Sequence, residues 1–216
     1  MKFTPDPLNS NCRLYQFRRF LNSNKSIYWC YDTLGPEVKT DLNVGCDDMS
    51  KLKVQEIHQE ALGYSAAVDP ITAPTPFISK SIHQCGEIQV HHENCEEKAG
   101  RVYELMLDNH TEMRFFYCRF AENFAVVKLR DEPNKRAYIS AGVITMSTPA
   151  LLDVEKDVER FCDTYEIDFA ELDILFTGNL PYIIDVNNIA GNGALWSKID
   201  KPGLATKLYV NQVKSL

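Results

Sequence analysis

The residues around Gly178-Asn179 combine acidic side chains with a pattern typical of a β-hairpin. Runs rich in Ile, Leu, Phe, Tyr and Val lie on both sides of this pair, and a short Gly-containing loop between such runs favours a hairpin. Because successive side chains of a strand point to opposite faces, a loop centred on Asn179 predicts one polar and one apolar face for residues 170–187. The polar face would carry Glu171, Asp173, Asp185 and Asn187. The apolar face would carry Leu172, Ile174, Ile184 and Val186.

In this arrangement Asp173 would lie directly across the hairpin from Asp185, and two carboxylates in that position repel each other. A hard divalent cation such as Mg²⁺ removes the repulsion, since it takes oxygen ligands from one or two carboxylates and completes its shell with phosphates and water. The alternative is a hairpin at the edge of a sheet whose acidic face is simply solvated. The spacing by itself leaves both interpretations open.

The order Glu-Leu-Asp-Ile-Leu, a turn and Tyr-Ile-Ile-Asp-Val-Asn resembles the end of the ATP-grasp nucleotide-binding fold. In that family an acid on one strand and an Asp/Glu-x-Asn on the next hold Mg²⁺ against the phosphates of ATP. The resemblance therefore implies metal ligands at Asp173, Asp185 and Asn187. Upstream motifs, from Ser50-Lys51 onward, follow in the order seen in a little-characterised bacterial ATP-grasp group, and the resemblance covers roughly residues 48 to 195.

The resemblance also implies nucleotide-binding residues in the first half of the chain. Lys80 lies in the apolar segment 77–81 and matches the lysine that contacts the α- and β-phosphates. Lys51 resembles an earlier lysine on the nucleotide side, although Lys53 is close enough to be the alternative. Glu104, Leu105 and Met106 match the strand that joins the two lobes of the family. The backbone of that strand recognises the adenine.

Three further cations, Arg114, Lys128 and Arg130, resemble the positions that face the γ-phosphate or the acyl phosphate. A nucleoside triphosphate remains anionic with Mg²⁺ bound, so a site for it must supply Lys or Arg donors, whose charge-assisted hydrogen bonds are the strong ones. Without the resemblance, each of these side chains would be interpreted as a surface cation that protects a strand edge from aggregation.

Composition indicates a soluble enzyme domain. The 216 residues, 44% of them hydrophobic, can bury a sizeable core, and no run approaches the length of a membrane span. A net charge of −7 argues against nucleic acid as the main partner. The N-terminus lacks the apolar region of a signal peptide, and seven scattered cysteines do not form a disulfide framework. We therefore expect a cytoplasmic protein with no membrane partner.

Hydrophobic periodicity predicts an α+β fold with mostly antiparallel sheets and two lobes. Helices are expected at 51–62, 151–165 and, as a short basic amphipathic candidate, 13–21. Strands are expected at 64–68, 76–81, 86–91, 101–107, 113–119 and 124–130, followed by the hairpin. The predicted divisions are an N-terminal segment 1–47 and an ATP-grasp domain 48–216. The resemblance implies that the domain which usually precedes the ATP-grasp fold is reduced or absent in the N-terminal segment. Within the ATP-grasp domain the small lobe would span about 48–103 and the large lobe about 104–216.

A competing metal site is suggested by His83, Cys85, His91, His92 and Cys95. Histidine and cysteine together suggest zinc, but their spacing is not that of a standard zinc finger. Solvated loop residues are the alternative. The same segment occupies the position of the flexible phosphate lid of the family, which usually carries more glycine.

The resemblance implies an ATP- and Mg²⁺-dependent ligase that activates a carboxylate as an acyl phosphate for attack by an amine or other nucleophile. A small-molecule kinase and a non-catalytic nucleotide-binding module are the alternatives. The expected substrates are a small-molecule or peptide carboxylate and a nucleophile. Whether the chain forms a homo-oligomer or needs a partner protein is left open.

Overall fold

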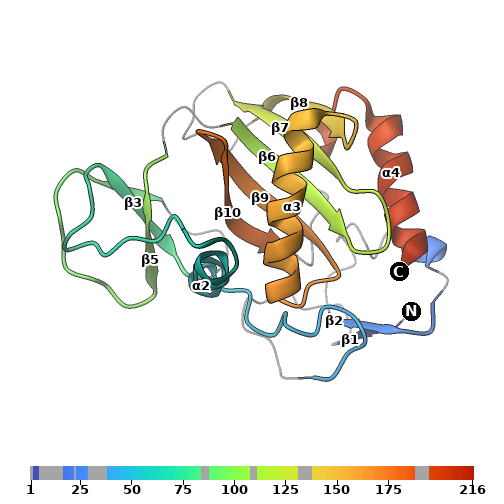
Figure 1. Ribbon diagram of the computed structural model, residues 1–216, viewed down its shortest axis with the longest axis horizontal. Helices are drawn as coiled ribbons and strands as arrows, with labels where there is room; N and C mark the ends of the chain where they lie inside the picture. Colours follow the sequence, from blue (N-terminus) through green and yellow to red (C-terminus); the bar gives the residue numbers. More distant parts are fainter. Residues whose placement is uncertain are drawn as a thin grey trace.

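The computed structural model describes residues 2–4, 17–21, 23–28, 38–83, 88–107, 111–130, 138–187 and 195–216. The larger of its sheets has five antiparallel strands in the order β10-β9-β6-β7-β8 (Figure 1). These strands are β6 (Thr111–Cys118), β7 (Phe124–Arg130), β8 (Tyr138–Thr145), β9 (Phe169–Thr177) and β10 (Leu180–Asn187). The antiparallel sheet predicted for an α+β fold is thus present in the second half of the chain.

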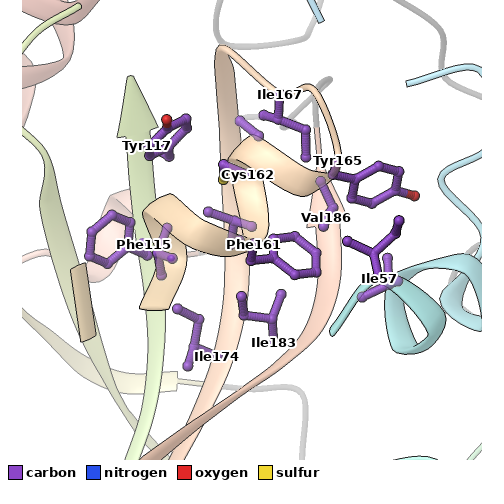
Figure 2. Close-up of a cluster of buried hydrophobic side chains, with 14 of the residues drawn as sticks. Ile57, Phe115, Tyr117, Phe161, Cys162, Tyr165, Ile167, Ile174, Ile183 and Val186 are labelled. Atoms are coloured by element: carbon purple, nitrogen blue, oxygen red, sulfur yellow. The ribbon is translucent and has the colours of Figure 1, made fainter. Parts of the chain in front are cut away.

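The two faces of the large sheet are buried under different helices, because neighbouring residues of each strand point to opposite sides. Phe115 packs in a core with helix α3 (Pro149–Thr164), whereas Phe116 packs in a second core with helix α4 (Pro202–Ser215). Figure 2 shows Phe161 of α3 beside Ile174 and Ile183 of the hairpin strands. None of the described helices is both long and apolar enough to cross a membrane.

The smaller sheet has the order β4-β3-β5 and lies at one end of the molecule (Figure 1). Its strands are β3 (Phe77–Ser81), β4 (Gln89–His91) and β5 (Arg101–Leu105). Helix α2 (Lys51–Leu62) lies between this sheet and the edge strand β10. Ser50 caps its first turn by accepting a hydrogen bond from the Lys53 amide, which is the usual reason for a serine at this position. The predicted helix 51–62 is confirmed.

A segment near the C-terminal end covers one edge of the large sheet, and two short strands pair separately from it. The segment that follows η2 (Trp196–Lys198) covers the outer edge of β8. Ile199 forms an isolated parallel bridge with Ala141, and the amide of Asp200 donates a hydrogen bond to the Ala141 carbonyl. Strands β1 (Lys2–Thr4) and β2 (Ser26–Tyr28) form a separate parallel pair.

Several predicted elements differ from the structure. No strand forms at 64–68, where only Ala67 makes an isolated bridge to Glu104, because the chain turns away at Asp69. Of the predicted helix 13–21, residues 13–16 lie outside the described ranges and Arg18–Phe20 form a 3-10 turn, η1. The sequence patterns did not predict β8 or α4. The helix predicted at 151–165 is present as α3, which starts two residues earlier with Pro149 at its first position.

Candidate functional site

The hairpin β9–β10 brings the predicted acidic residues together. Asp185 lies opposite Asp173 and Asn187 lies opposite Glu171, as the sequence pattern predicts. All four side chains belong to the sheet face that carries Phe116, away from helix α3. The polar face of the predicted hairpin is therefore real, and it continues the α4 side of the sheet.

This register is reached by a different route from the predicted one. The turn consists of Gly178 and Asn179, whose φ angles of 55° and 71° are both positive, and it pairs Thr177 with Leu180. An irregularity between Ile183 and Asp185 then inserts one extra residue and restores the expected pairing. As a result Ile183, rather than Ile184, packs in the core beside α3, which corrects the predicted apolar face.

The carboxylate of Asp173 is bonded by two cations from neighbouring strands. Arg114 of β6 donates from Nε to Oδ1 at 3.0 Å and from Nη2 to Oδ2 at 2.8 Å. Lys128 of β7 donates from Nζ to Oδ1 of Asp173 and to Oε1 of Glu112, the latter at 3.0 Å. Arg114 also pairs with Glu171 at 3.5 Å. The predicted Arg114 and Lys128 thus lie directly beside the predicted metal ligand.

The pKa values of the two facing carboxylates of the hairpin are shifted in opposite directions. Burial by itself would raise the pKa of Asp173, but the charges and hydrogen bonds of Arg114 and Lys128 lower it well below the ordinary value. Burial raises the pKa of Asp185, Lys51 opposes that shift from 4.0 Å, and the Asp173 charge adds to it. Lys51 is more distant from Asp185 than Arg114 and Lys128 are from Asp173, so a bound cation would relieve Asp185 most.

Asn187 completes the hairpin site with a polar group that has no partner. Its side-chain nitrogen is buried and makes no hydrogen bond in the described part of the chain. An unsatisfied buried polar atom costs about 1–3 kcal/mol, which marks a place where a ligand or a rotated amide would gain contacts.

The donor set at this place fits a cation that shares its shell with another ligand. Among the described residues, no three His, Cys, Asp or Glu side chains are placed to hold a metal by themselves. Two carboxylates and an amide oxygen from Asp173, Asp185 and Asn187 suit Mg²⁺, which usually keeps waters and phosphates in its shell.

A second buried ion pair joins the small sheet to this site. Lys80 of β3 donates to Oε2 of Glu104 on β5 at 2.7 Å, and its Nζ lies 3.5 Å from the Ile184 carbonyl in the irregular part of β10. Burial raises the pKa of Glu104, and the Lys80 charge opposes the shift. Leu105, the last residue of β5, and Met106, which follows it, are half-buried.

Side chains that the sequence analysis did not single out hold the edge of β10. Gln55 of α2 donates to the Ile183 carbonyl at 3.2 Å and lies 3.5 Å from Glu104. The ring of His58 and the hydroxyl of Tyr64 both contact the Pro181 carbonyl, at 3.1 and 2.9 Å. The polar residues Gln55 and His58 among the apolar positions of α2 are the signal that would have revealed these contacts.

The described members of the competing zinc site are not gathered around a metal position. His91 lies 2.7 Å from the Ser79 hydroxyl and 3.7 Å from the Cys95 sulfur, and Cys85 lies outside the described residues. With His83 and His92, the described members form no group that could hold a metal. Arg130 is placed at the end of β7, and its side chain is outside the described part.

A polar cavity of 270 Å³ lies elsewhere, between the β6–β7 turn and α3. Its walls include Arg119, Asn123, Glu155 and Asp163, which are already bonded to other protein groups. None of the predicted site residues lines it, so this cavity is separate from the ion pairs around Asp173.

Comparisons place the fold. The sequence matches no protein-family model and no curated protein. Among solved structures, the ATP-grasp ligase PsnB complexed with a minimal precursor, Mg and ADP is similar with a TM-score of 0.54 and 14% identity, over 80% of this chain and 62% of the PsnB chain. PsnB complexed with the precursor peptide PsnA2 and AMPPNP gives a TM-score of 0.53 and 13% identity, over 80% of this chain and 61% of that chain.

A third similar structure is the L-amino acid ligase from Bacillus licheniformis, with a TM-score of 0.50 and 16% identity over 78% of this chain and 48% of that chain. The chain therefore spans about three fifths of the PsnB structures it matches, and less of the other ligase. The two antiparallel sheets, the polar hairpin and these likenesses agree on one conclusion: the protein has the ATP-grasp fold.

Proposed function

We propose that the protein is an ATP- and Mg²⁺-dependent ligase that activates a carboxylate as an acyl phosphate. One observation carries the proposal: four buried or half-buried cations gather around the carboxylates of a single site. These are Lys51, Lys80, Arg114 and Lys128. Lys and Arg side chains are the donors that bind polyphosphates, and the carboxylates beside them could take a metal that accompanies the phosphates.

The proposed roles follow from position. Lys51 and Lys80 lie on the small-sheet side of the site and would bind the phosphates of ATP, while the end of β5 at Glu104, Leu105 and Met106 would border the adenine. The ligands of Mg²⁺ would be Asp173, Asp185 and Asn187. When bound, the metal would neutralise phosphate charge next to these carboxylates.

The chemistry needs positioning and charge stabilisation rather than a covalent nucleophile on the protein. A substrate carboxylate oxygen attacks the γ-phosphorus of ATP, the bond to the bridging oxygen breaks, and ADP leaves. An amine then attacks the acyl carbon, phosphate leaves, and the amine loses a proton. Arg114, Lys128 and Arg130 would stabilise the charge on the transferred phosphoryl group.

The likeness to structures determined with a precursor peptide, and to an L-amino acid ligase, supports a peptide or amino-acid carboxylate as the substrate class. The proposal also divides the chain into an N-terminal segment 1–47, a small lobe about 48–103 and a large lobe about 104–216. The placement of Lys80 on one sheet and Asp173 on the other supports two lobes.

A hydroxylamine trap tests the reaction class. The protein is incubated with Mg-ATP, pools of amino acids or peptides, and hydroxylamine, and both ADP and acyl hydroxamates are measured. We expect hydroxamate in proportion to ADP in the wild type and a strong loss in Asp185→Asn. The matched control is Asp153→Asn, an exposed acid of α3 that lies outside the site.

Other outcomes separate the alternatives. ADP formation with a phosphorylated hydroxyl group and no hydroxamate would indicate a kinase. Nucleotide binding without ADP formation across all pools would favour a binding module, and absence of nucleotide binding would contradict the proposal altogether.

A further inference from the structure

Both oxygens of the Asp173 carboxylate are already occupied by positive partners. Arg114 approaches them with two nitrogens in a forked arrangement, at 3.0 Å to Oδ1 and 2.8 Å to Oδ2. The ammonium of Lys128 reaches Oδ1 as well. The central candidate metal ligand is therefore neutralised by the protein itself.

This pairing opposes the binding of a free divalent cation. A cation at Asp173 would meet the charges of Arg114 and Lys128 at close range in a site shielded from water, where Coulomb repulsion is weakly screened. Among the described residues no three His, Cys, Asp or Glu side chains are placed to hold a metal, and the neighbouring acids Glu171 and Glu112 are themselves engaged with Arg114 and Lys128. The hairpin acids alone are thus a poor site for a metal.

A polyphosphate changes the balance because it offers the two cations another anion. Each of the two cations is also held by a second acid, Arg114 by Glu171 at 3.5 Å and Lys128 by Glu112 at 3.0 Å. Their exposure differs, because the side chain of Arg114 is 17% exposed and that of Lys128 is 1% exposed. Arg114 is consequently the partner that an arriving anion can reach first. Phosphate oxygens accept the same forked contact from a guanidinium that a carboxylate does.

We propose that Arg114, assisted by Lys128, closes the hairpin site to free divalent cations, and that a nucleotide polyphosphate opens it by drawing Arg114 off Asp173. This inference rests on the proposed function for the identity of the anion. Its consequence is an order of events in which the metal enters with the nucleotide or after it.

Binding of Mn²⁺ alone, followed by the EPR signal of the free ion, tests the closed state without any nucleotide. We expect wild-type protein to bind Mn²⁺ weakly, and Arg114→Met to bind it at least tenfold more tightly. Adding Asp173→Asn to Arg114→Met should abolish the gain. In Arg114→Met, Lys128 still pairs with Asp173, so the carboxylate is not left alone; Arg114→Gln provides a second uncharged variant.

The matched control is Arg119→Met. Arg119 directly follows the last residue of β6. It pairs with Asp163 and Asp168, which lie outside the candidate site. Its truncation should leave the Mn²⁺ affinity within twofold of wild type. An equal gain in Arg119→Met would mean that freeing any acidic pair binds Mn²⁺, and it would overturn the assignment to Arg114.

Addition of AMPPNP tests the opening step. In wild type it should produce bound Mn²⁺ that is sensitive to Asp173→Asn. Equal Mn²⁺ affinity of wild type and both Arg114 variants without nucleotide would overturn the inference even if Mg-ATP binds and turns over. Conversely, a gain in the Arg114 variants without any binding of AMPPNP would contradict the proposed function and the opening step, while the closed state would stand.

Discussion

Asp185 lies directly opposite Asp173 across the hairpin, although the two-residue turn at Gly178-Asn179 starts the pairing one position out of that register. The irregularity between Ile183 and Asp185 supplies the missing residue. It also leaves the Ile183 carbonyl facing Gln55 and the Ile184 carbonyl facing Lys80. One local distortion therefore places a carboxylate in the site and joins β10 to both α2 and β3.

Replacing Asp185 by Asn should weaken Mg²⁺-dependent nucleotide binding while preserving the fold. The substitution removes a ligand charge, and it also removes a carboxylate whose pKa is raised by burial, so the apo protein should not be destabilised. Isothermal titration with AMPPNP, with and without Mg²⁺, measures the effect, for which we expect at least a tenfold loss in the presence of Mg²⁺. Unchanged affinity would contradict the metal site and favour the alternative interpretation, in which the acidic face of the hairpin is simply solvated.

Lys80→Met should destabilise the apo protein, because it leaves the buried Glu104 carboxylate without its cation. Loss of one partner of a buried pair costs about 3–5 kcal/mol. Glu104→Gln in the same chain should restore most of that stability, as measured by urea unfolding. A double-mutant cycle with no coupling between the two positions would show that the pair does not form in solution.

The double variant Lys80→Met/Glu104→Gln also tests the phosphate role of Lys80 without the stability defect. Ligands stabilise a protein by binding selectively to its folded state. We expect the rise in melting temperature caused by Mg-ATP to be much smaller in the double variant than in Glu104→Gln alone. Equal shifts would exclude Lys80 as a phosphate ligand.

His58 should make stability depend on pH. Burial lowers its pKa, while hydrogen bonds to the Tyr64 and Pro181 carbonyls oppose that shift. With the folded-state pKa below the unfolded value of about 6.5, the unfolded chain takes up the proton first, so stability falls as the pH drops below about 6.5. Melting temperatures at pH 8 and pH 5.5 should therefore differ more in wild type than in His58→Gln. The opposite ordering would mean that the two carbonyls outweigh burial.

Gln55→Leu should destabilise the junction of α2 with β10. Gln55 accepts a hydrogen bond from the Ala66 amide at 3.0 Å and donates to the Ile183 carbonyl, and both backbone groups would lose their partner. We expect a loss of about 2 kcal/mol in urea unfolding and faster amide exchange at Ala66. Gln59→Leu, on the exposed side of the same helix, is the control and should change stability by less than about 0.5 kcal/mol.

Local pattern was sufficient to predict much of the fold. The alternation of polar and apolar residues in the hairpin, and the helical period in α2 and α3, indicated these elements. Strands β6 and β7 were predicted as well, and the structure buries side chains on both of their faces. The facing of Asp173 and Asp185 was predicted from a loop centred on Asn179, whereas the structure reaches it through a two-residue turn and one extra residue in β10. Strand β8 and helix α4 escaped prediction, since their burial depends on partners distant in the chain, such as Phe116 for α4.

The sequence by itself thus determined the acidic hairpin, its cationic neighbours by type, and the resemblance to the ATP-grasp fold. Tertiary structure alone decided which charges meet: Arg114 with Asp173, 59 residues away, and Lys80 with Glu104 rather than with open solvent. The physical reason is that a buried charge takes whichever opposite charge the packing of separate strands brings within hydrogen-bond distance. No periodicity along a single strand encodes that choice.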